Sequence, residues 1–299
     1  MLAVNTLMSH DEPPEIAQIK QEVAEVFSRV APVFDQVGPR FFSYFGRRLV
    51  ELARLPSGAR VLDVATGRGA VLFPAAEAVG PQGHVLGIDL SETMVEETRQ
   101  DLMRRGVPNA EVRPMDAEYL QLSDESFDYV LCGFSIFFFP QLDRALSEFR
   151  RVLRPHGRLA VTTFDELFQK QWNWLYELLE AYLPPEPEVN KATQSPSPKQ
   201  PVFDKADGLE EIMNAAGFTD IQVVSEACEF TYADEEEWWS TLWSHGLRRG
   251  LERLERAKGS GGLRSFKADA FEMIQGQKQV DGIHDLIPVL FTMATKPRA

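Results

Sequence analysis

The segment VLDVATGRG, from Val61 to Gly69, decides the fold because it joins a buried strand to a glycine turn. Val61 and Leu62 are apolar and favour a strand, and the glycines that follow let the chain turn tightly beneath a ligand. A helix predicted over residues 70–79 presents free amides at its N-terminus, which favour an anionic group. A second strand ends at Asp89, where a carboxylate accepts the hydroxyls of a ribose. One bound nucleoside therefore explains both features.

The spacing of the glycines distinguishes two nucleoside cofactors. A dinucleotide fingerprint needs G-x-G-x-x-G, but here Gly67 and Gly69 are followed by Leu72 at the third position. Asp63 would repel a diphosphate, whereas it can fix the loop amides or bind an ammonium group. The pattern D-x-A-x-G-x-G therefore predicts a site for S-adenosylmethionine. A glycine turn without a ligand is the alternative for the loop taken alone.

Composition and charge limit the classes of partner. The chain of 299 residues, 44% of them hydrophobic, is long enough for one enlarged domain with a full core. Its 45 acidic and 31 basic residues give a net charge of −14, which disfavours binding to nucleic acid or anionic lipid. Cys132 and Cys228 lack the spacing of a disulfide framework or a metal site, so we expect a reducing cytoplasm and no metal. The N-terminus has no basic region or long apolar run, so we expect neither export nor membrane insertion.

Strand-like and helix-like segments alternate after Asp89, as an α/β sheet requires. Ser91 predicts the start of a helix, and Gly106 predicts its end. The segment FDYVLCGFS at 127–135 is almost continuously apolar, which indicates a strand buried on both faces. The further core elements expected are strands at 110–112 and 157–164 and an amphipathic helix at 142–153.

Several sequence motifs occur in the order found in one enzyme family. They are VFSRVAPVFD at 26–35, VLDVATGRG, GIDLS, MDAEYL, SFDYVLCGFS and FRRVLRPHGRLAV. Over residues 23–164 and 208–224 the chain resembles class I S-adenosylmethionine-dependent methyltransferases, specifically the branch that contains the ubiquinone and menaquinone biosynthesis enzymes. The resemblance implies an α/β, Rossmann-like sheet of seven mostly parallel strands in the order 3-2-1-4-5-7-6, with strand seven antiparallel. Segments 221–232 and 286–296 would supply the last two strands.

The resemblance also implies which residues bind the cofactor. The loop from Ala65 to Gly69 would pass under the methionine half, and Asp89 would bind the ribose. Asp116 and the amide of the next residue would recognise the adenine. The cofactor-binding residues expected are Asp63, Ala65, Thr66, Gly67, Arg68, Gly69, Asp89, Leu90, Met94, Asp116, Ala117, Cys132 and Gly133.

Four of these residues have alternative roles. Asp89 and Asp116, each taken alone, are equally compatible with capping a helix or forming a turn, but their joint placement after successive strands favours ligand binding. Cys132 is also compatible with a small buried apolar side chain. Arg68 stands where the quinone enzymes usually have threonine, and we expect it to pair with the cofactor's carboxylate. A solvated loop arginine is the alternative.

The expected acceptor site departs from the pattern of the quinone enzymes. Phe34 replaces a tyrosine, and Phe137 and Phe138 stand where those enzymes have an arginine and an asparagine. A site that exchanges polar groups for phenyl rings predicts a flatter or more apolar acceptor, or one recognised elsewhere. The substrate-binding residues expected are Phe34, Phe137, Phe138, Trp239 and Trp243.

The regions outside the core are expected to close the pocket. We expect a helical lid at 1–50, a cofactor-binding core at 51–164, a helical insertion with a proline-rich linker at 165–206, and the rest of the sheet at 207–299 with a helical cap at 234–277. All five tryptophans of the chain lie in the insertion and the cap. Most are expected to be packing residues, with one or two of Trp239, Trp243 and Phe138 facing the substrate.

The chemistry of methyl transfer asks little of side chains. The reaction is an in-line displacement at a carbon attached to sulfonium, and holding the nucleophile at about 3 to 3.5 Å supplies much of the acceleration. A base is needed only where the acceptor must lose a proton. His245 and His284 are candidates, but lone histidines are more often structural, so no catalytic base is assigned.

We therefore expect a methyltransferase that methylates an oxygen, nitrogen or carbon of a small, largely apolar metabolite and releases S-adenosylhomocysteine. A homodimer is left open. One alternative is an enzyme with the same fold and cofactor that performs another reaction, such as a cyclisation. A noncatalytic binding module is a second alternative, and Leu72 argues against an NAD-linked oxidoreductase.

Overall fold

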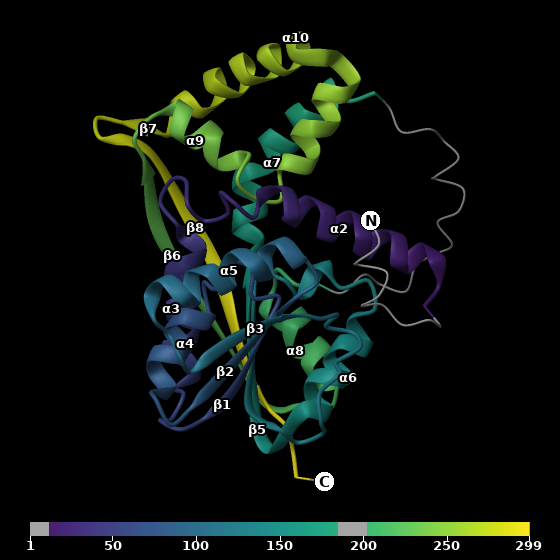
Figure 1. Ribbon diagram of the computed structural model, residues 1–299. Coiled ribbons are helices and arrows are strands. Elements are labelled where there is room, and N and C mark those ends of the chain that lie inside the picture. Colours follow the sequence, from purple (N-terminus) through teal and green to yellow (C-terminus); the bar gives the residue numbers. More distant parts are fainter. Residues whose placement is uncertain (1–11, 185–201, 299) are drawn as a thin grey trace.

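A mostly parallel sheet organises the protein and confirms the expected α/β class. The computed structural model describes residues 12–184 and 202–298. Its strands follow the order β3-β2-β1-β4-β5-β8-β6 (Figure 1), with parallel pairing up to β5 and antiparallel pairing of β8 with both neighbours. The strands are β1 (Arg60–Val64), β2 (His84–Asp89), β3 (Ala110–Pro114), β4 (Phe127–Gly133), β5 (Leu153–Phe164), β6 (Thr219–Tyr232), β7 (Lys278–Gln279) and β8 (Gly282–Thr295).

The strand count is one higher than expected. The additional strand is β7, which has two residues and pairs only with the start of β8. It forms a short hairpin where the chain returns from the cap to the sheet, a length too short to leave a period-2 pattern in the sequence. The order of the longer strands is the one that the family resemblance implies.

Helices cover both faces of the sheet and form a separate cap. On one face lie α3, α4 and α5, and on the other lie α6 and α8 (Figure 1). The helices are α2 (Pro14–Val30), α3 (Phe41–Ala53), α4 (Leu72–Val79), α5 (Glu92–Arg105), α6 (Leu142–Val152), α7 (Glu166–Tyr182), α8 (Ala206–Ala215), α9 (Glu235–Leu242) and α10 (Arg248–Ile274), with 3-10 turns η1 (Ile136–Phe138) and η3 (Gln275–Gln277).

The alternation of side chains along β1 explains why the sheet is buried on both faces. Val61 packs with the layer of α3, α4 and α5, whereas Leu62 and Val64 pack with α6 and α8. Successive side chains of a strand point to opposite faces, so an unbroken apolar run fills two cores at once. The short strand β1 is thereby held rigidly, with the loop that follows it at the carboxyl edge of the sheet.

The local signals at the helix ends are the expected ones. Ser91 caps α5 by accepting a hydrogen bond from the amide of Met94 at 3.1 Å, and Gly106 ends the helix in the left-handed region with φ 63°. Asp165 caps α7 by accepting a hydrogen bond from the amide of Leu167. These caps fix the directions in which the chain leaves β2 and β5.

The cap is an apolar cluster of its own above the carboxyl edge of the sheet (Figure 1). It is built from α7, α9 and α10, and β6 and β8, each of 14 residues, reach beyond the rest of the sheet into it. Trp172 and Trp238 stack there at 5.9 Å between ring centroids. Most of the proline-rich linker expected within 165–206 falls at residues 185–201, which lie outside the described residues. None of the described helices is long and apolar enough to cross a membrane.

Candidate functional site

A large cavity of about 1050 Å³ lies where the carboxyl ends of the strands meet α2 and the cap. This is the edge at which open α/β sheets bind ligands. We call the part lined by the segments after β1, β2 and β3 the loop end. We call the part lined by phenylalanines and by the cap the cap end. The two ends differ in chemistry and are described in turn.

The glycine loop after β1 is a tight turn held by its own hydrogen bonds. Gly67 and Gly69 have φ of 51° and 79°, a region that favours glycine. The hydroxyl of Thr66 donates to Asp63 Oδ2 at 2.6 Å, and the amide of Gly69 donates to the carbonyl of Thr66 at 2.8 Å. A side chain at Gly69 would collide with the ring of Phe73, because an added Cβ would lie 2.6 Å from it. The loop is therefore preformed around Asp63.

Asp89 ties the end of β2 to this loop. Its Oδ2 accepts a hydrogen bond from the amide of Gly67, and its Oδ1 accepts one from the amide of Ser91, both at 2.9 Å. Burial raises the pKa of Asp89 to about 6. Burial also raises the pKa of Asp63 to about 7, against the hydrogen bond from Thr66, and the nearby charge of Asp89 adds to this rise. A cation bound here would favour the ionised form of both carboxyls.

A buried lysine of the N-terminal helix lies among the carboxylates after β3. The Nζ of Lys20 on α2 is 2.7 Å from Asp116 Oδ2 and 2.5 Å from Glu118 Oε2, and it also bonds to Glu12. Burial lowers the pKa of Lys20, but these carboxylates outweigh burial and leave the pKa raised. In the described part of the chain, Glu12, Asp116 and Glu118 form the one carboxylate group with metal-ligand spacing, and the ammonium already pairs with each. Lys20 therefore fastens α2 to the loop end.

Lys20 was not predicted from the sequence. The signal available in the sequence was a lysine on the apolar face of an amphipathic helix. In the structure, Lys20 and Ala24 lie one turn apart on that face of α2, and both are buried. Such a charge needs a partner, and long side chains often solve this by reaching to solvent instead. Only the packed structure shows that the partner is Asp116, 96 positions along the chain.

Most of the predicted cofactor residues line the cavity, and all of these but Gly133 belong to its loop end. Those that line it are Asp63, Ala65, Thr66, Gly67, Asp89, Leu90, Met94, Asp116, Ala117 and Gly133. Gly69, Arg68 and Cys132 do not line it. The sequence pattern thus brings together ten of its thirteen residues at one surface.

Arg68 points away from the cavity and is buried, which fits neither alternative considered for it. Its Nη2 is 2.8 Å from Asp101 Oδ2, its Nη1 is 3.2 Å from Glu97, and the same nitrogen donates to the carbonyl of Ala31 at 2.6 Å. The guanidinium thus binds two carboxylates of α5 and one carbonyl of the chain that follows α2. Arg68 therefore joins the loop to the lid rather than facing the cofactor's carboxylate or solvent.

Cys132 is a fully buried side chain of the sheet. Its Sγ lies 2.9 Å from the hydroxyl of Ser135, and burial raises the pKa of the thiol to about 12. It packs with the α6 and α8 layer rather than against the cavity. This placement matches the packing role that was the alternative for Cys132.

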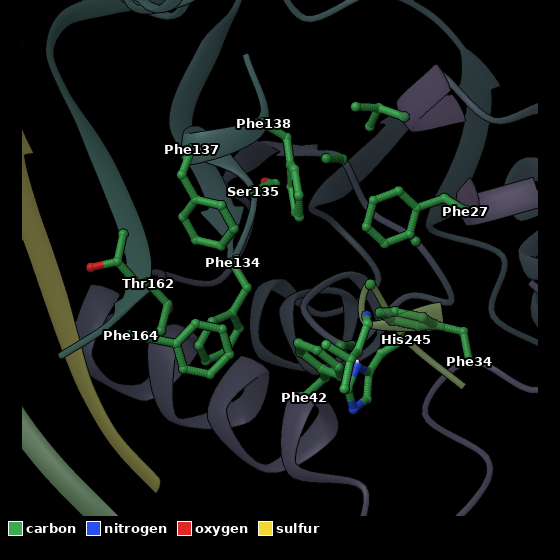
Figure 2. A pocket seen from close by; sticks show the side chains of 18 of the residues that line it. Phe27, Phe34, Phe42, Phe134, Ser135, Phe137, Phe138, Thr162, Phe164 and His245 are labelled. Carbon is green, nitrogen blue, oxygen red and sulfur yellow. Dashed lines mark hydrogen bonds between the residues drawn. The ribbon is translucent and has the colours of Figure 1, made fainter. Parts of the chain in front are cut away.

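A closed ring of phenyl groups surrounds the cap end of the cavity (Figure 2). Each ring contacts the next with centroids 4.7 to 6.4 Å apart, in the edge-on, tilted or stacked arrangements that aromatic pairs prefer. We call this ring the phenylalanine girdle. In order around it, its members are Phe34, Phe27, Phe138, Phe137, Phe164, Phe134 and Phe42.

The girdle contains the three predicted phenylalanines Phe34, Phe137 and Phe138 together with four that sequence reasoning missed. The added members come from α2, α3 and the ends of β4 and β5, four elements that meet only in the folded chain. No spacing along the sequence relates them. The hint available was the number of phenylalanines, 20 in 299 residues.

The predicted tryptophans of the cap do not line the cavity. Trp239 packs instead against Phe266 and Phe271 inside the cap, and Trp243 packs against Trp239. Trp238 and Leu242 line the cavity in their place. Residues four positions apart share a face of a helix, so Trp239 and Trp243 lie on one face and Trp238 and Leu242 on the next. The prediction was therefore wrong by one residue, and it named the face next to the one that lines the cavity.

His245 and His284 have different surroundings. His245, between α9 and α10, lines the cavity, and burial lowers its pKa to about 4. His284 on β8 lies outside the cavity lining, 2.9 Å from Asp281 and 3.3 Å from Glu229, and the bond to Asp281 raises its pKa. Of the two candidates for a base, the structure places only His245 at the cavity.

A buried carboxyl on β8 is another ionisable group of the cap end. Asp285 lines the cavity, and its Oδ1 accepts a hydrogen bond from the amide of Gln171 at 2.8 Å. Its Oδ2 accepts a longer one from the hydroxyl of Tyr232 at 3.5 Å. Burial raises the pKa of Asp285 to about 7. The carboxyl is satisfied by groups of the protein on α7 and β6.

Comparison with known proteins identifies relatives of the chain. A family model described as a methyltransferase domain matches residues 55–217. The aklanonic acid methyltransferase DauC of Streptomyces sp. strain C5 is 45% identical over 123 residues, which are 41% of this chain and 56% of that protein. The nocamycin O-methyltransferase of Saccharothrix syringae is 33% identical over 226 residues, which are 72% of this chain and 79% of that protein. The chain thus spans just over half the length of the first relative and about four fifths of the second.

Solved structures share the fold over most of the chain. The YcgJ protein of Bacillus subtilis, 17% identical, aligns with a TM-score of 0.56 over 86% of this chain and 100% of its own. The [4+2]-cyclase SpnF, 18% identical, aligns with a TM-score of 0.56 over 94% of this chain and 97% of its own. At these identities the likeness concerns the fold alone. The family model and the nocamycin relative show that the chain belongs to the methyltransferase domain family of S-adenosylmethionine-dependent enzymes.

Proposed function

We propose that the protein transfers the methyl group of S-adenosylmethionine to an oxygen of a small, flat, largely apolar acceptor and releases S-adenosylhomocysteine. The observation that carries this proposal is the division of one cavity into an acidic loop end and a girdle of phenyl rings. The first end suits a charged nucleoside, and the second suits an apolar ring system. The similarity to the nocamycin O-methyltransferase supports oxygen as the attacked atom.

The loop end fits the cofactor on its own geometry. Asp89 lines the cavity with its carboxylate fixed by two amides, so it can accept the ribose hydroxyls without moving. Asp63 and the left-handed Gly67 would lie beside the methionine half, where a cation is favoured. Asp116 and Ala117 would hold the adenine. The sulfonium of the bound cofactor supplies the methyl group.

The cap end would position the acceptor and exclude water. The girdle rings offer stacking and edge contacts to a flat molecule but few hydrogen bonds. Positioning is most of the catalysis in an in-line displacement, and a dry chamber favours a reaction in which charge is neutralised. The ring of Phe138 on η1 contacts the ring of Phe27 on α2, with centroids 5.3 Å apart. Because this contact closes one side of the chamber, α2 would have to move for an acceptor to enter.

The finer expectations about partners and location are part of the same proposal. A net charge of −14 supports a small-molecule acceptor rather than nucleic acid. Two free cysteines support a cytoplasmic location. We propose catalysis without a metal, since the carboxylates with metal-ligand spacing already hold Lys20. A homodimer stays a prediction.

The proposal is tested with methyl-labelled S-adenosylmethionine and a panel of flat aromatic acids and phenols that includes aklanonic acid. We expect a labelled product by mass spectrometry, with release of S-adenosylhomocysteine, and much less product from the Asp89→Ala variant at the same cofactor concentration. A product isomeric with its substrate and free of label would instead indicate a cyclisation. Failure to bind either cofactor form in calorimetry would leave only a binding module.

A further inference from the structure

His245 is a polar side chain of the cap that lines the cavity near the phenylalanine girdle. Its ring contacts Phe41 with centroids 6.3 Å apart, and Phe41 contacts the girdle member Phe42 at 4.1 Å. Phe34 lies against the glycine loop, since a Cβ built on Gly67 would be 3.7 Å from that ring, and it stacks on Phe42 at 4.9 Å. These rings connect His245 to the loop that would carry the methionine half of the cofactor, and all of them line the cavity.

The hydrogen bonds of His245 indicate which of its nitrogens carries the proton. The Nδ1 atom accepts a hydrogen bond from the amide of Leu247 at 3.5 Å, just before α10 begins. Burial lowers the pKa of the ring to about 4, and the positive end of α10 acts in the same direction. The neutral ring with Nδ1 as acceptor has its hydrogen on Nε2. Within the described residues no acceptor is bonded to that Nε2.

Two other polar groups at the cap end are already engaged. Asp285 accepts hydrogen bonds from Gln171 and Tyr232, and the hydroxyl of Ser135 is in contact with Cys132. His245 thus joins Trp172, whose indole N–H is also without a partner among the described residues, and the hydroxyls of Thr162 and Thr163 as an unsatisfied polar group of the cavity lining. A donor that faces an apolar chamber needs an acceptor atom, which a ligand can supply.

We propose that His245 donates a hydrogen bond from Nε2 to an oxyanion of the acceptor, so that the substrate class is a flat aromatic acid that is ionised before methyl transfer. This inference rests on the proposed function and specifies the substrate of the same site. An oxygen lone pair of the oxyanion forms the new bond to the methyl carbon. The electron pair of the broken carbon–sulfur bond stays on sulfur. The negative and positive charges cancel, and no proton moves.

The charges explain why His245 acts as a donor rather than as a base. A base would become an imidazolium beside a sulfonium in an apolar chamber, which the low pKa of the ring opposes. An oxyanion instead pairs with the sulfonium before the reaction, and both charges vanish as the bond forms. Hydrogen bonds to an ionised acceptor are also about twice as strong as neutral ones.

The test uses anthracene-2-carboxylate and its neutral methyl ester as probes of the full chain saturated with S-adenosylhomocysteine. We expect the wild-type complex to bind the carboxylate at least about 10-fold more tightly than the ester, as followed by probe fluorescence. His245→Phe should lose this preference and still bind the ester. His245→Gln keeps a donor near the position of Nε2, so it should retain the preference within about threefold, whereas His245→Glu should lose it.

Several outcomes would overturn the inference. They are a wild-type complex without preference for the carboxylate, a His245→Phe variant that keeps the preference, and labelled methyl transfer that His245→Glu supports but His245→Gln does not. The last outcome would identify a base. Cofactor affinity and melting temperature of each variant show that it is folded. Failure of the proposed function appears separately, as wild-type protein that binds no cofactor or forms no labelled product.

Discussion

The two ends of the cavity are built in different ways. At the loop end, the carboxyls of Asp63, Asp89 and Asp116 lie at the ends of consecutive strands of one α/β unit. Neighbouring amides fix Asp89 and Asp116, and the hydroxyl of Thr66 fixes Asp63. At the cap end, the girdle collects rings from elements scattered along the chain, and the rings hold one another. Local backbone geometry therefore determines the chemistry of the proposed cofactor site, whereas tertiary packing determines the shape of the proposed acceptor chamber.

This difference has a functional consequence that variants can test. A change at the loop end should alter affinity for the cofactor and leave the acceptor chamber intact. A change in the girdle should do the reverse. A change at Lys20 should affect both ends. Lys20 binds Asp116 of the loop end, and it lies on α2, the helix that also carries Phe27 of the girdle. The two ends are thus joined through the lid.

Replacement of Asp89 by alanine should have the largest effect. The variant removes the carboxylate that holds the amides of Gly67 and Ser91 and that is proposed to accept the ribose hydroxyls. We expect affinity for S-adenosylhomocysteine to fall about 100-fold, or about 2.8 kcal/mol, in calorimetry. Glu96→Gln on the exposed face of α5 is the control and should bind normally. Full affinity in Asp89→Ala would show that the loop end is not the cofactor site.

Replacement of Phe138 by alanine should have the next largest effect, at the other end. It removes a ring that contacts both Phe27 and Phe137 in the girdle. We expect the acceptor KM to rise about 20-fold while cofactor affinity stays within about twofold. The matched control is Phe271→Ala, a phenylalanine of the cap that packs on Trp239 outside the cavity lining. An equal rise in KM for the control would mean that the effect came from the stability of the cap.

The same division explains how much of the site could be predicted from sequence. The loop end was predictable because the strand, the turn glycines and the acid ending β2 lie within 29 positions, from Val61 to Asp89, and their meaning is local. The choice of Trp239 over Trp238 failed because one residue on a helix turns a side chain by about 100°, which an unaligned sequence cannot orient. Arg68 was misplaced because its acceptor on Ala31 belongs to a distant segment.

The pH dependence of cofactor binding should show a smaller effect at the loop end. Burial raises the pKa of Asp63 to about 7 and of Asp89 to about 6 in the empty site, and a sulfonium cation favours the ionised carboxylates. Affinity for S-adenosylmethionine should therefore rise about 10-fold as pH increases from 5.5 to 8 and then level off. Calorimetry at several pH values measures this directly.

The uncharged thioether of S-adenosylhomocysteine provides the control for this titration, since its affinity should rise less steeply over the same range. Stability should show the opposite trend in the empty protein. A carboxyl whose pKa is raised by folding binds more protons in the folded chain, so the free energy of unfolding should fall as pH rises from about 4 to 7. Affinity that is flat between pH 5.5 and 8 would mean that Asp63 and Asp89 are ionised already.

Replacement of Arg68 by methionine should have the smallest effect on binding, although Arg68 belongs to the glycine loop. Its guanidinium bonds to Asp101, Glu97 and the carbonyl of Ala31, so its role is to hold the loop against α5 and the lid. We expect cofactor affinity to change less than about threefold, while stability falls by roughly 2 kcal/mol because Asp101 loses a buried partner. Arg104→Met is the matched control, since Arg104 pairs with the same Asp101 from an exposed position and should cost less stability. If Arg68→Met instead lost cofactor affinity as strongly as Asp89→Ala, the arginine would have to turn into the cavity when the cofactor binds, and the loop end would not be preformed.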